Sequence, residues 1–191
     1  MTVNVRLKKQ ASLIKKLERI GWPQFYYPTE IVKDLIGARI VCWFPDDCYE
    51  LSKLIRSSLH FTVPTGHEEL RDYQANPQAA GYRALHMFVD VAYDSVRRSG
   101  EIAEIVPSRM MAEIQIRTKL QDSWADITHE FFYKAKDAGI ESKEFESFLS
   151  DLSARLAQED KTLIKFRTFY QQLADDKAML GVRTGFRDED N

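Results

Sequence analysis

The chain of 191 residues has few cysteines, no long hydrophobic run and almost no net charge. Its two cysteines, Cys42 and Cys48, lack metal-ligand spacing and are too few for a disulfide framework. No apolar stretch reaches membrane-spanning length, and none follows the basic N-terminus as a signal peptide requires. A formal net charge of −2 gives no overall attraction to nucleic acid or anionic membrane. We therefore expect a cytoplasmic protein without a membrane partner, whose phosphate binding depends on local charge.

The sequence also lacks the glycine-rich loop of P-loop enzymes and the motifs of protein kinases. Any chemistry with ATP therefore requires another fold. One local cluster of charge is present, because residues 1–20 carry six cations and a single acid, Glu18. Such a cluster is a candidate polyphosphate site, although charge alone favours the commoner alternative of a solvated helix face.

Hydrophobic periodicity divides the chain into strands and helices. It predicts strands at 3–7, 36–44, 82–91 and 110–117, and helices at 10–20, 45–59 and 118–136. The polar segment 64–81 contains proline and glycine and predicts a long functional loop. The segment 93–109 is interpreted as a charged excursion between two strands. The length suits one domain with a real core and an added helical arm.

The last third of the chain has a different pattern. Apolar residues recur from Phe145 to Leu173 at spacings of four and three, interrupted at Glu159. This pattern predicts a helix with one apolar seam. We favour a seam for a partner helix, and hence a homo-oligomer, over packing against the chain's own domain. Beyond Lys177 the chain is polar, and we expect it to fray.

Period-two alternation places polar residues together at 112–117. It puts Glu113, Gln115 and Arg117 on one face of the predicted strand and the apolar residues on the other. Three polar residues on one face are consistent with the lining of a site. The ordinary alternative is a strand with one face exposed to solvent.

Two further stretches carry residues suited to nucleotide chemistry. Tyr82 and His86 share one side of their strand, and they offer a flat surface to a base and a donor to phosphate. A half-buried tyrosine beside a hydrogen-bonded histidine fits the same pattern. Asp34 precedes a hydrophobic strand, where a carboxylate suits Mg²⁺ held jointly with substrate phosphates. A turn or capping aspartate is the alternative there.

Five stretches then occur in a characteristic order: RLKKQASLIKK at 6–16, DLIGAR at 34–39, GYRALH at 81–86, AEIQIRT at 112–118 and WADITH at 124–129. Together they resemble the synthetase domain of RelA/SpoT proteins over about residues 3–136. The helical tail resembles the arm through which small, single-domain alarmone synthetases assemble.

The resemblance implies an α/β (α+β) fold, with a mixed β-sheet flanked by helices and related to nucleotidyltransferases. It implies a synthetase domain at 1–140 and a C-terminal helical arm at 141–176, and the polar composition beyond them predicts a flexible tail at 177–191. The implied reaction moves the β,γ-pyrophosphate of ATP to the ribose 3′-hydroxyl of GDP or GTP. The product is the alarmone (p)ppGpp, and the implied cofactor is Mg²⁺.

By position, the resemblance implies roles for individual residues. Asp34 and Glu113 would bind Mg²⁺, and Glu113 would also take the proton from the attacking hydroxyl. Two arginines would sandwich the adenine of ATP and two lysines would hold its phosphates, namely Arg6, Arg39, Lys8 and Lys16. Tyr82 would stack on the acceptor base, supported by Arg71, His86, Gln115, Arg117 and His129.

The loop before Tyr82 departs from the family's pattern. Gln78 stands where a cation for the acceptor phosphate is common, and Ala79 and Ala80 replace polar residues. The acceptor is therefore open between guanine nucleotides and the adenine nucleotides or tRNA 3′ end used by toxic relatives. A non-catalytic nucleotide-sensing or interaction module is a third alternative, against which Asp34 and Glu113 argue.

The position of the motifs also leads to two expectations. The first motif lies almost at residue 1, which suggests a domain cut from a longer protein. No His-Asp hydrolase domain is present, so we expect no alarmone hydrolysis.

Overall fold

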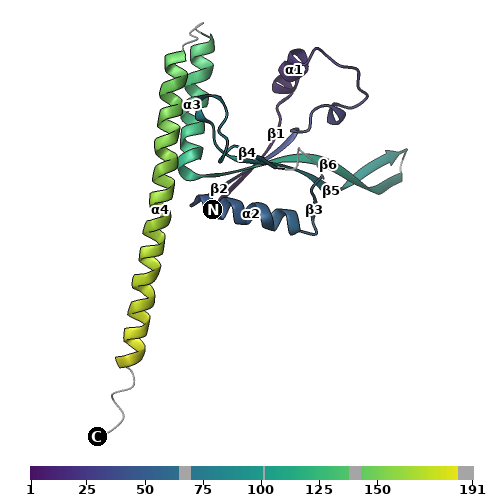
Figure 1. Cartoon of the computed structure of the whole chain (residues 1–191). Helices are drawn as coiled ribbons and strands as arrows, with labels where there is room; N and C mark the ends of the chain where they lie inside the picture. The colour runs from purple at the N-terminus through teal and green to yellow at the C-terminus, as the bar shows by residue number, and fades with distance from the viewer. Residues whose placement is uncertain (65–69, 101, 138–142, 185–191) are drawn as a thin grey trace.

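The structure, a computed structural model, describes residues 1–64, 70–100, 102–137 and 143–184 (Figure 1). Its centre is a six-stranded sheet in the order β1-β2-β6-β5-β3, with β4 paired to β5. The strands are β1 (Thr2–Leu7), β2 (Ile36–Cys42), β3 (Phe61–Thr62), β4 (Leu70–Asp72), β5 (Leu85–Ser99) and β6 (Ile102–Thr118). Only the β2–β6 pair is parallel among these strands, so the predicted mixed sheet is confirmed.

The described residues form four α-helices around the sheet: α1 (Gln10–Arg19), α2 (Pro45–Ser57), α3 (Lys119–Asp137) and α4 (Lys143–Thr184). Two 3₁₀ turns, η1 (Pro28–Glu30) and η2 (Ala79–Gly81), lie in the connecting segments. Helix α2 begins at Pro45, whose fixed φ suits the first turn, and Asp46 and Asp47 lie at the positive end of its dipole. In the described residues, no helix combines the length and apolarity needed to cross a bilayer.

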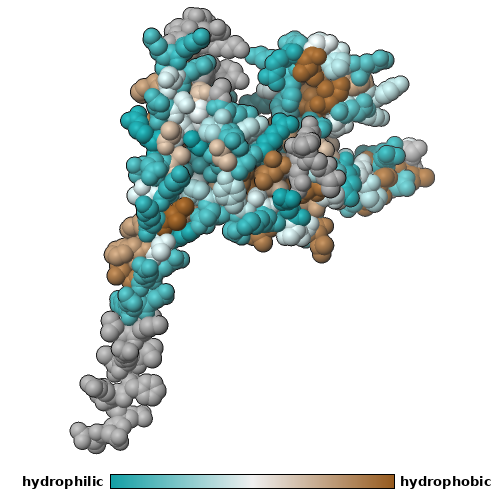
Figure 2. All heavy atoms as spheres, in the orientation of Figure 1, coloured by the Kyte–Doolittle hydropathy of each residue, from teal (hydrophilic) through white to brown (hydrophobic). Residues whose placement is uncertain are grey.

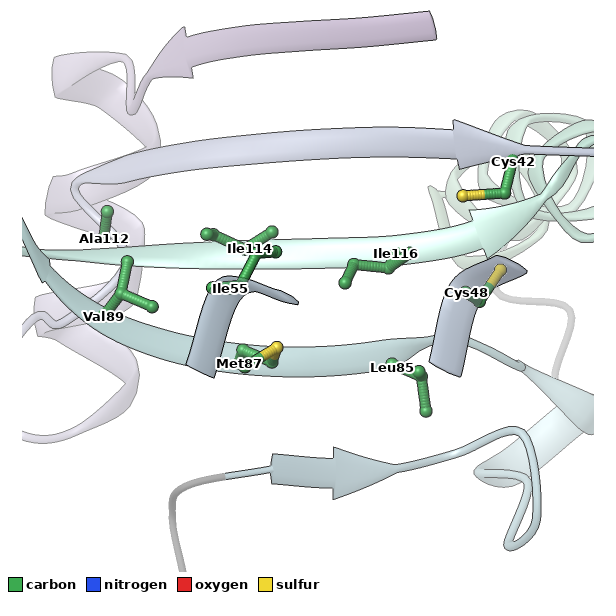
Figure 3. Packing of buried hydrophobic residues seen from close by; sticks show 9 residues of the cluster. All are labelled: Cys42, Cys48, Ile55, Leu85, Met87, Val89, Ala112, Ile114 and Ile116. Carbon is green, nitrogen blue, oxygen red and sulfur yellow. The ribbon is translucent and has the colours of Figure 1, made fainter. Parts of the chain in front are cut away.

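The hydrophobic core lies on one face of the sheet. Alternate residues of β5 and β6, among them Met87 and Ile114, meet Cys48 and Ile55 of α2 (Figure 3). Because side chains of a strand alternate between faces, this packing directs the intervening polar residues to the opposite face. That opposite face carries the candidate site.

The interpretation of 93–109 as an excursion is wrong. β5 and β6 continue through it as one antiparallel hairpin, from Tyr93 opposite Ser108 to Ser99 opposite Ile102 (Figure 1). This part of the hairpin projects from the body, and Val96 and Ile105 are exposed. Without a buried face, no alternation marks the strands in the sequence. The predicted loop at 64–81 also contains a short strand, β4.

The two halves of α4 have different surroundings. Leu149, Leu152 and Leu156 pack against Trp124 and Tyr82, so this half of the predicted seam contacts the chain's own domain. Farther along, the seam residues are exposed, and Figure 1 shows α4 extending well beyond the sheet. The helix continues past Lys177 to Thr184, and 185–191 lie outside the described residues. The division into domain, arm and tail stays a prediction.

Gly81 fixes the contact between α4 and the segment that leads to Tyr82. Its φ is +86°, and a Cβ at this position would lie 2.7 Å from Cβ of Ser153 and 3.0 Å from Cα of Ser150. The Ser153 hydroxyl donates a hydrogen bond to the Gly81 carbonyl oxygen. Helix and loop therefore meet without room for a side chain.

Gly81→Ala should lower the free energy of unfolding by about 2–5 kcal/mol, because left-handed strain and overpacking add. Gly21→Ala is the matched control, since φ is +76° there with nothing within 4 Å of the added Cβ. Its cost should be only the strain, about 1–2 kcal/mol. Equal losses for both variants in urea unfolding would show that the helix contact is not tight.

Candidate functional site

A row of polar residues crosses the face of the sheet opposite α2. Strand register places five side chains next to one another on neighbouring strands, in the order Asn4, Arg39, Gln115, His86 and Arg71. Register partners lie on the same face of a sheet. Four of these five residues are predicted site residues, although they are far apart in sequence.

A second row lies two residues away along the strands. It contains Arg6 of β1, Gly37 of β2 and Glu113 of β6. The Arg6 side chain lies over Gly37, with Nε 3.6 Å from where a Cβ would stand. Arg6 and Glu113 therefore face the same space across a residue without a side chain.

Asp34 is held between two lysines at the edge of this space. Lys8 Nζ lies 2.7 Å from Oδ2, and Lys16 Nζ lies 2.7 Å from Oδ1. Burial raises the pKa of the Asp34 carboxyl, but the hydrogen bonds from Lys16 and Lys8 outweigh burial, and the pKa lies below its usual value. Asp34 is thus ionised at neutral pH, and two of the six cations in residues 1–20, Lys8 and Lys16, contact it.

Glu113 is the second carboxylate of the site. Its Oε1 lies 3.0 Å from Nδ1 of His86, and its Oε2 accepts a hydrogen bond from Gln115 Nε2 at 3.0 Å. Burial raises the pKa of Glu113, but the interactions with His86 and Gln115 exceed this effect and lower it overall. Because a carboxylate only accepts, His86 donates from Nδ1, and its Nε2 lies 2.8 Å from the Tyr82 hydroxyl oxygen, within hydrogen-bond distance.

Two aspartates of α3 neutralise the arginines of the site. Arg39 Nη1 lies 2.9 Å from Asp126 Oδ1 and 3.4 Å from Asp122 Oδ1. Arg117, which is 1% exposed, lies with its Nε 2.8 Å from Asp122 Oδ1. Burial lowers the pKa of Arg117, and its Nη2 has no hydrogen-bond partner among the described residues. A buried guanidinium with an unpaired donor is suited to an anionic or carbonyl ligand.

Two cavities open on this polar face and share Arg6, Arg39 and Gln115. The smaller, about 260 Å³, is lined by Asp34 and Glu113 as well. The larger, about 640 Å³, extends towards α3 and α4 and is within the size range of small-molecule sites. The remaining site residues in its wall are Tyr82, Arg117 and His129.

Eight of the twelve predicted site residues line these cavities, and four line neither of them: Lys8, Lys16, Arg71 and His86. Arg71 lies at the far end of the polar row, with its guanidinium 5.5 Å from the centre of the Phe88 ring, and lines neither cavity. Lys8 and Lys16 contact Asp34, and Asp34 lines the smaller cavity.

Several residues of the site were missed in the sequence. Asp122 and Asp126 are four apart on α3, a spacing that places two carboxylates on one helix face and would have pointed to paired cations. Glu146 of α4 also lines the larger cavity. No sequence pattern pointed to it, because it depends on how α4 packs.

Comparisons with known proteins identify the family of the chain. A model of the region found in RelA/SpoT proteins matches residues 5–138. The chain belongs to the RelA/SpoT family. It is 34% identical over 132 residues to the GTP pyrophosphokinase YjbM of Bacillus subtilis, and 33% identical over 135 residues to YwaC of the same organism. These alignments cover 69% and 68% of the chain and 56% of each relative, so the chain spans about half the length of these curated relatives.

Solved structures of similar proteins have the same fold. The small alarmone synthetase 1 of Bacillus subtilis, bound to its product pppGpp, gives a TM-score of 0.72 at 27% identity. The match covers 90% of this chain and 80% of that one. A GTP pyrophosphokinase family protein of Streptococcus pneumoniae gives 0.71 at 26% identity, covering 91% and 78%. The predicted RelA/SpoT resemblance and fold class are therefore confirmed.

Asp34→Asn should reduce the free energy of unfolding by about 1 kcal/mol at neutral pH, because it removes two ion pairs. A carboxyl whose pKa is lowered by folding stabilises the protein above its unfolded pKa, and this contribution disappears as the pH falls through the folded pKa. The difference in unfolding free energy between the wild type and the variant should therefore decrease as the pH falls below about 4. Urea unfolding across this pH range measures it.

Glu18→Gln, on the exposed side of α1, is the control and should have little effect at any pH. If the loss of unfolding free energy in Asp34→Asn stays constant from neutral pH down to about pH 3.5, the ion-pair assignment is contradicted.

Proposed function

We propose that this chain transfers the β,γ-pyrophosphate of ATP to the ribose 3′-hydroxyl of GDP or GTP, giving (p)ppGpp. The observation that carries the proposal is the smaller cavity, where Asp34 and Glu113 face one space with Arg6 and Arg39. Relatives named GTP pyrophosphokinases and a similar structure bound to pppGpp support it.

ATP would bind through the residues of β1, α1 and β2. Lys8 and Lys16 contact Asp34. A triphosphate carries more negative charge than one carboxylate, so both ammonium groups would move onto its phosphates. Arg6 and Arg39 line both cavities, and their guanidinium planes suit the two faces of adenine.

The two carboxylates fit Mg²⁺. Among the described residues, no group of three or more histidine, cysteine, aspartate or glutamate side chains forms a metal site by itself. Magnesium is commonly held by one or two carboxylates together with substrate phosphates, which matches Asp34 and Glu113. When bound, Mg²⁺ would neutralise the charge that develops on the transferred group.

The acceptor nucleotide would occupy the larger cavity. Tyr82 lies in its wall and is fixed there by the hydrogen bond to His86 and by the ring of Trp124, 6.4 Å away between centroids. The unpaired Nη2 of Arg117 would donate to the acceptor. Gln115 and His129 line the same wall.

In the reaction, the 3′-hydroxyl oxygen attacks the β-phosphorus of ATP and forms a new oxygen–phosphorus bond. The bond from this phosphorus to the bridging α,β-oxygen breaks, and AMP leaves with that electron pair. Glu113 takes the hydroxyl proton, while His86 and Gln115 keep the carboxylate oriented. The chain thus acts chiefly by positioning and by charge neutralisation.

An acceptor screen tests this function. The chain is incubated with Mg²⁺, labelled ATP and one acceptor at a time: GDP, GTP, AMP, ADP, ATP or deacylated tRNA. We expect transfer to GDP or GTP, with AMP as the second product and a 3′ linkage by product analysis. Transfer only to adenine nucleotides or tRNA, or to no acceptor at all, would contradict the proposal.

Carboxamide variants test the two carboxylates of the site in the same screen. Asp34→Asn and Glu113→Gln should each lower turnover by about 10²–10³-fold, because each removes a charge that acts on the transferred group. Asp94→Asn, an exposed carboxylate of the β5–β6 hairpin, should keep wild-type turnover. Circular dichroism of all three variants should match the wild type.

We also propose that the outer half of α4 pairs with a second copy of the chain. Arg167 ties α4 to α2 through Asp46 and Asp47, and beyond it the helix leaves the body (Figure 1). Phe166 and Tyr170 are each 64% exposed, and Figure 2 shows apolar side chains gathered on this part of α4. Large contiguous apolar patches are typical of interaction surfaces.

Tyr170→Glu combined with Leu173→Glu should therefore shift the sedimentation coefficient from an oligomer to a monomer. Gln171→Glu with Gln172→Glu adds the same charge on other faces of the helix and should leave the oligomer intact. A monomeric wild type at tens of micromolar would refute the proposed interface.

A further inference from the structure

A third cavity, of about 420 Å³, lies apart from the two described above and shares no lining residue with them. Its walls come from the start of α2, from the segment that leads to Tyr82, from the first turn of α3 and from the middle of α4. Gln74 and Arg83 line it from the segment between β4 and β5. The lining residues from α4 are Ala154, Ala157, Gln158, Asp160 and Lys161.

The wall contains a buried carboxylate that the protein only half satisfies. Asp160 is 0% exposed, and its Oδ2 accepts hydrogen bonds from Thr118 Oγ1 at 2.7 Å and from Gln121 Nε2 at 3.3 Å. Its Oδ1 is buried without a hydrogen-bond partner among the described residues. Burial raises the pKa of Asp160 to about 6, against the opposing hydrogen bonds. A cationic donor beside this buried carboxylate would stabilise its ionised form.

The same cavity contains cations that do not neutralise Asp160. Arg83 Nη1 donates to the Gln74 carbonyl oxygen at 2.7 Å, but its Nε is buried without a hydrogen-bond partner in the described part of the chain. Lys161 lies exposed in the lining. No ion pair between described residues joins either cation to Asp160. The cavity thus presents a separate anionic group and a separate cationic group.

The geometry points to a binding site for a small zwitterion of the free amino-acid class, with its ammonium on Asp160 and its carboxylate on Arg83 and Lys161. A guanidinium suits a carboxylate, and a buried carboxylate suits an ammonium. The cavity of about 420 Å³ has room for a molecule of this size. The rest of its wall combines small or apolar residues with polar ones, namely Pro45, Ala75, Ala154 and Ala157 with Tyr49, Gln74, Gln121 and Gln158. Such a ligand would satisfy both unpaired groups at once, which a simple anion or a simple cation would not.

Binding to the full chain tests this inference without any measurement of activity. Isothermal titration calorimetry is carried out with each proteinogenic L-amino acid, and then with the deaminated acid and the decarboxylated amine of any that binds. We expect at least one amino acid to bind with a Kd below about 1 mM, and its two analogues to bind at least about tenfold more weakly. No binding by any amino acid, or equal binding of either analogue, would overturn the inference.

Variants locate the site. Asp160→Asn and Arg83→Gln should each weaken binding at least about tenfold. Ala157→Leu fills the cavity from α4, leaves both charged groups in place, and should abolish binding even if Asp160→Asn impairs folding. Asp151→Asn, an exposed carboxylate of the same helix outside the cavity lining, should bind like the wild type. Unchanged affinity of Ala157→Leu would contradict the site.

Hydrogen exchange gives an independent location. The amino acid should slow exchange in residues 74–75 and 154–161, which contain lining residues of this cavity and none of the 640 Å³ cavity. Protection confined to the walls of the 640 Å³ cavity would instead place the ligand in the candidate active site and overturn the assignment.

Discussion

The alternation of side chains along β6 is the constraint on which the rest of the structure depends. Ala112, Ile114 and Ile116 are buried on the α2 side, so Glu113 and Gln115 must face the other way. Because β6 is central, between β2 and β5, these polar residues meet partners from both neighbouring strands. The same period-two pattern that builds the core therefore builds the site. A shift of one residue in this strand would exchange the two faces and destroy both.

Charge compensation is the second theme of the site. Asp34 is paired with two lysines, and Arg39 and Arg117 are paired with aspartates of α3. A nucleotide and its metal would exchange partners within this set rather than meet unpaired charges. Such an arrangement keeps the carboxylates ionised and the cations close together before the substrate arrives. It also explains how a chain with little net charge can offer a local polyphosphate site.

The fold class and most of the site residues could be predicted from the sequence. The alternation of side chains along a strand and the order of the motifs both depend on residues that are close together in the chain. Glu113, Gln115 and His86 fell on one face for that reason. The β5–β6 arm was missed because its two exposed faces leave no hydrophobic alternation. The two halves of α4 were not separated because their seams have the same spacing, and only tertiary packing distinguishes Leu149 from Tyr170. Asp122 and Asp126 were missed because their role depends on arginines distant in sequence.

The central claim is that Asp34, Glu113 and the two lysines of the basic cluster form one site for ATP and its metal. A crystal structure of the chain with Mg²⁺ and α,β-methylene-ATP tests this claim most directly. The account predicts that Lys8 and Lys16 leave Asp34 and contact the phosphates, with the metal between Asp34 and Glu113. A nucleotide bound elsewhere, with both lysines still on Asp34, would contradict it.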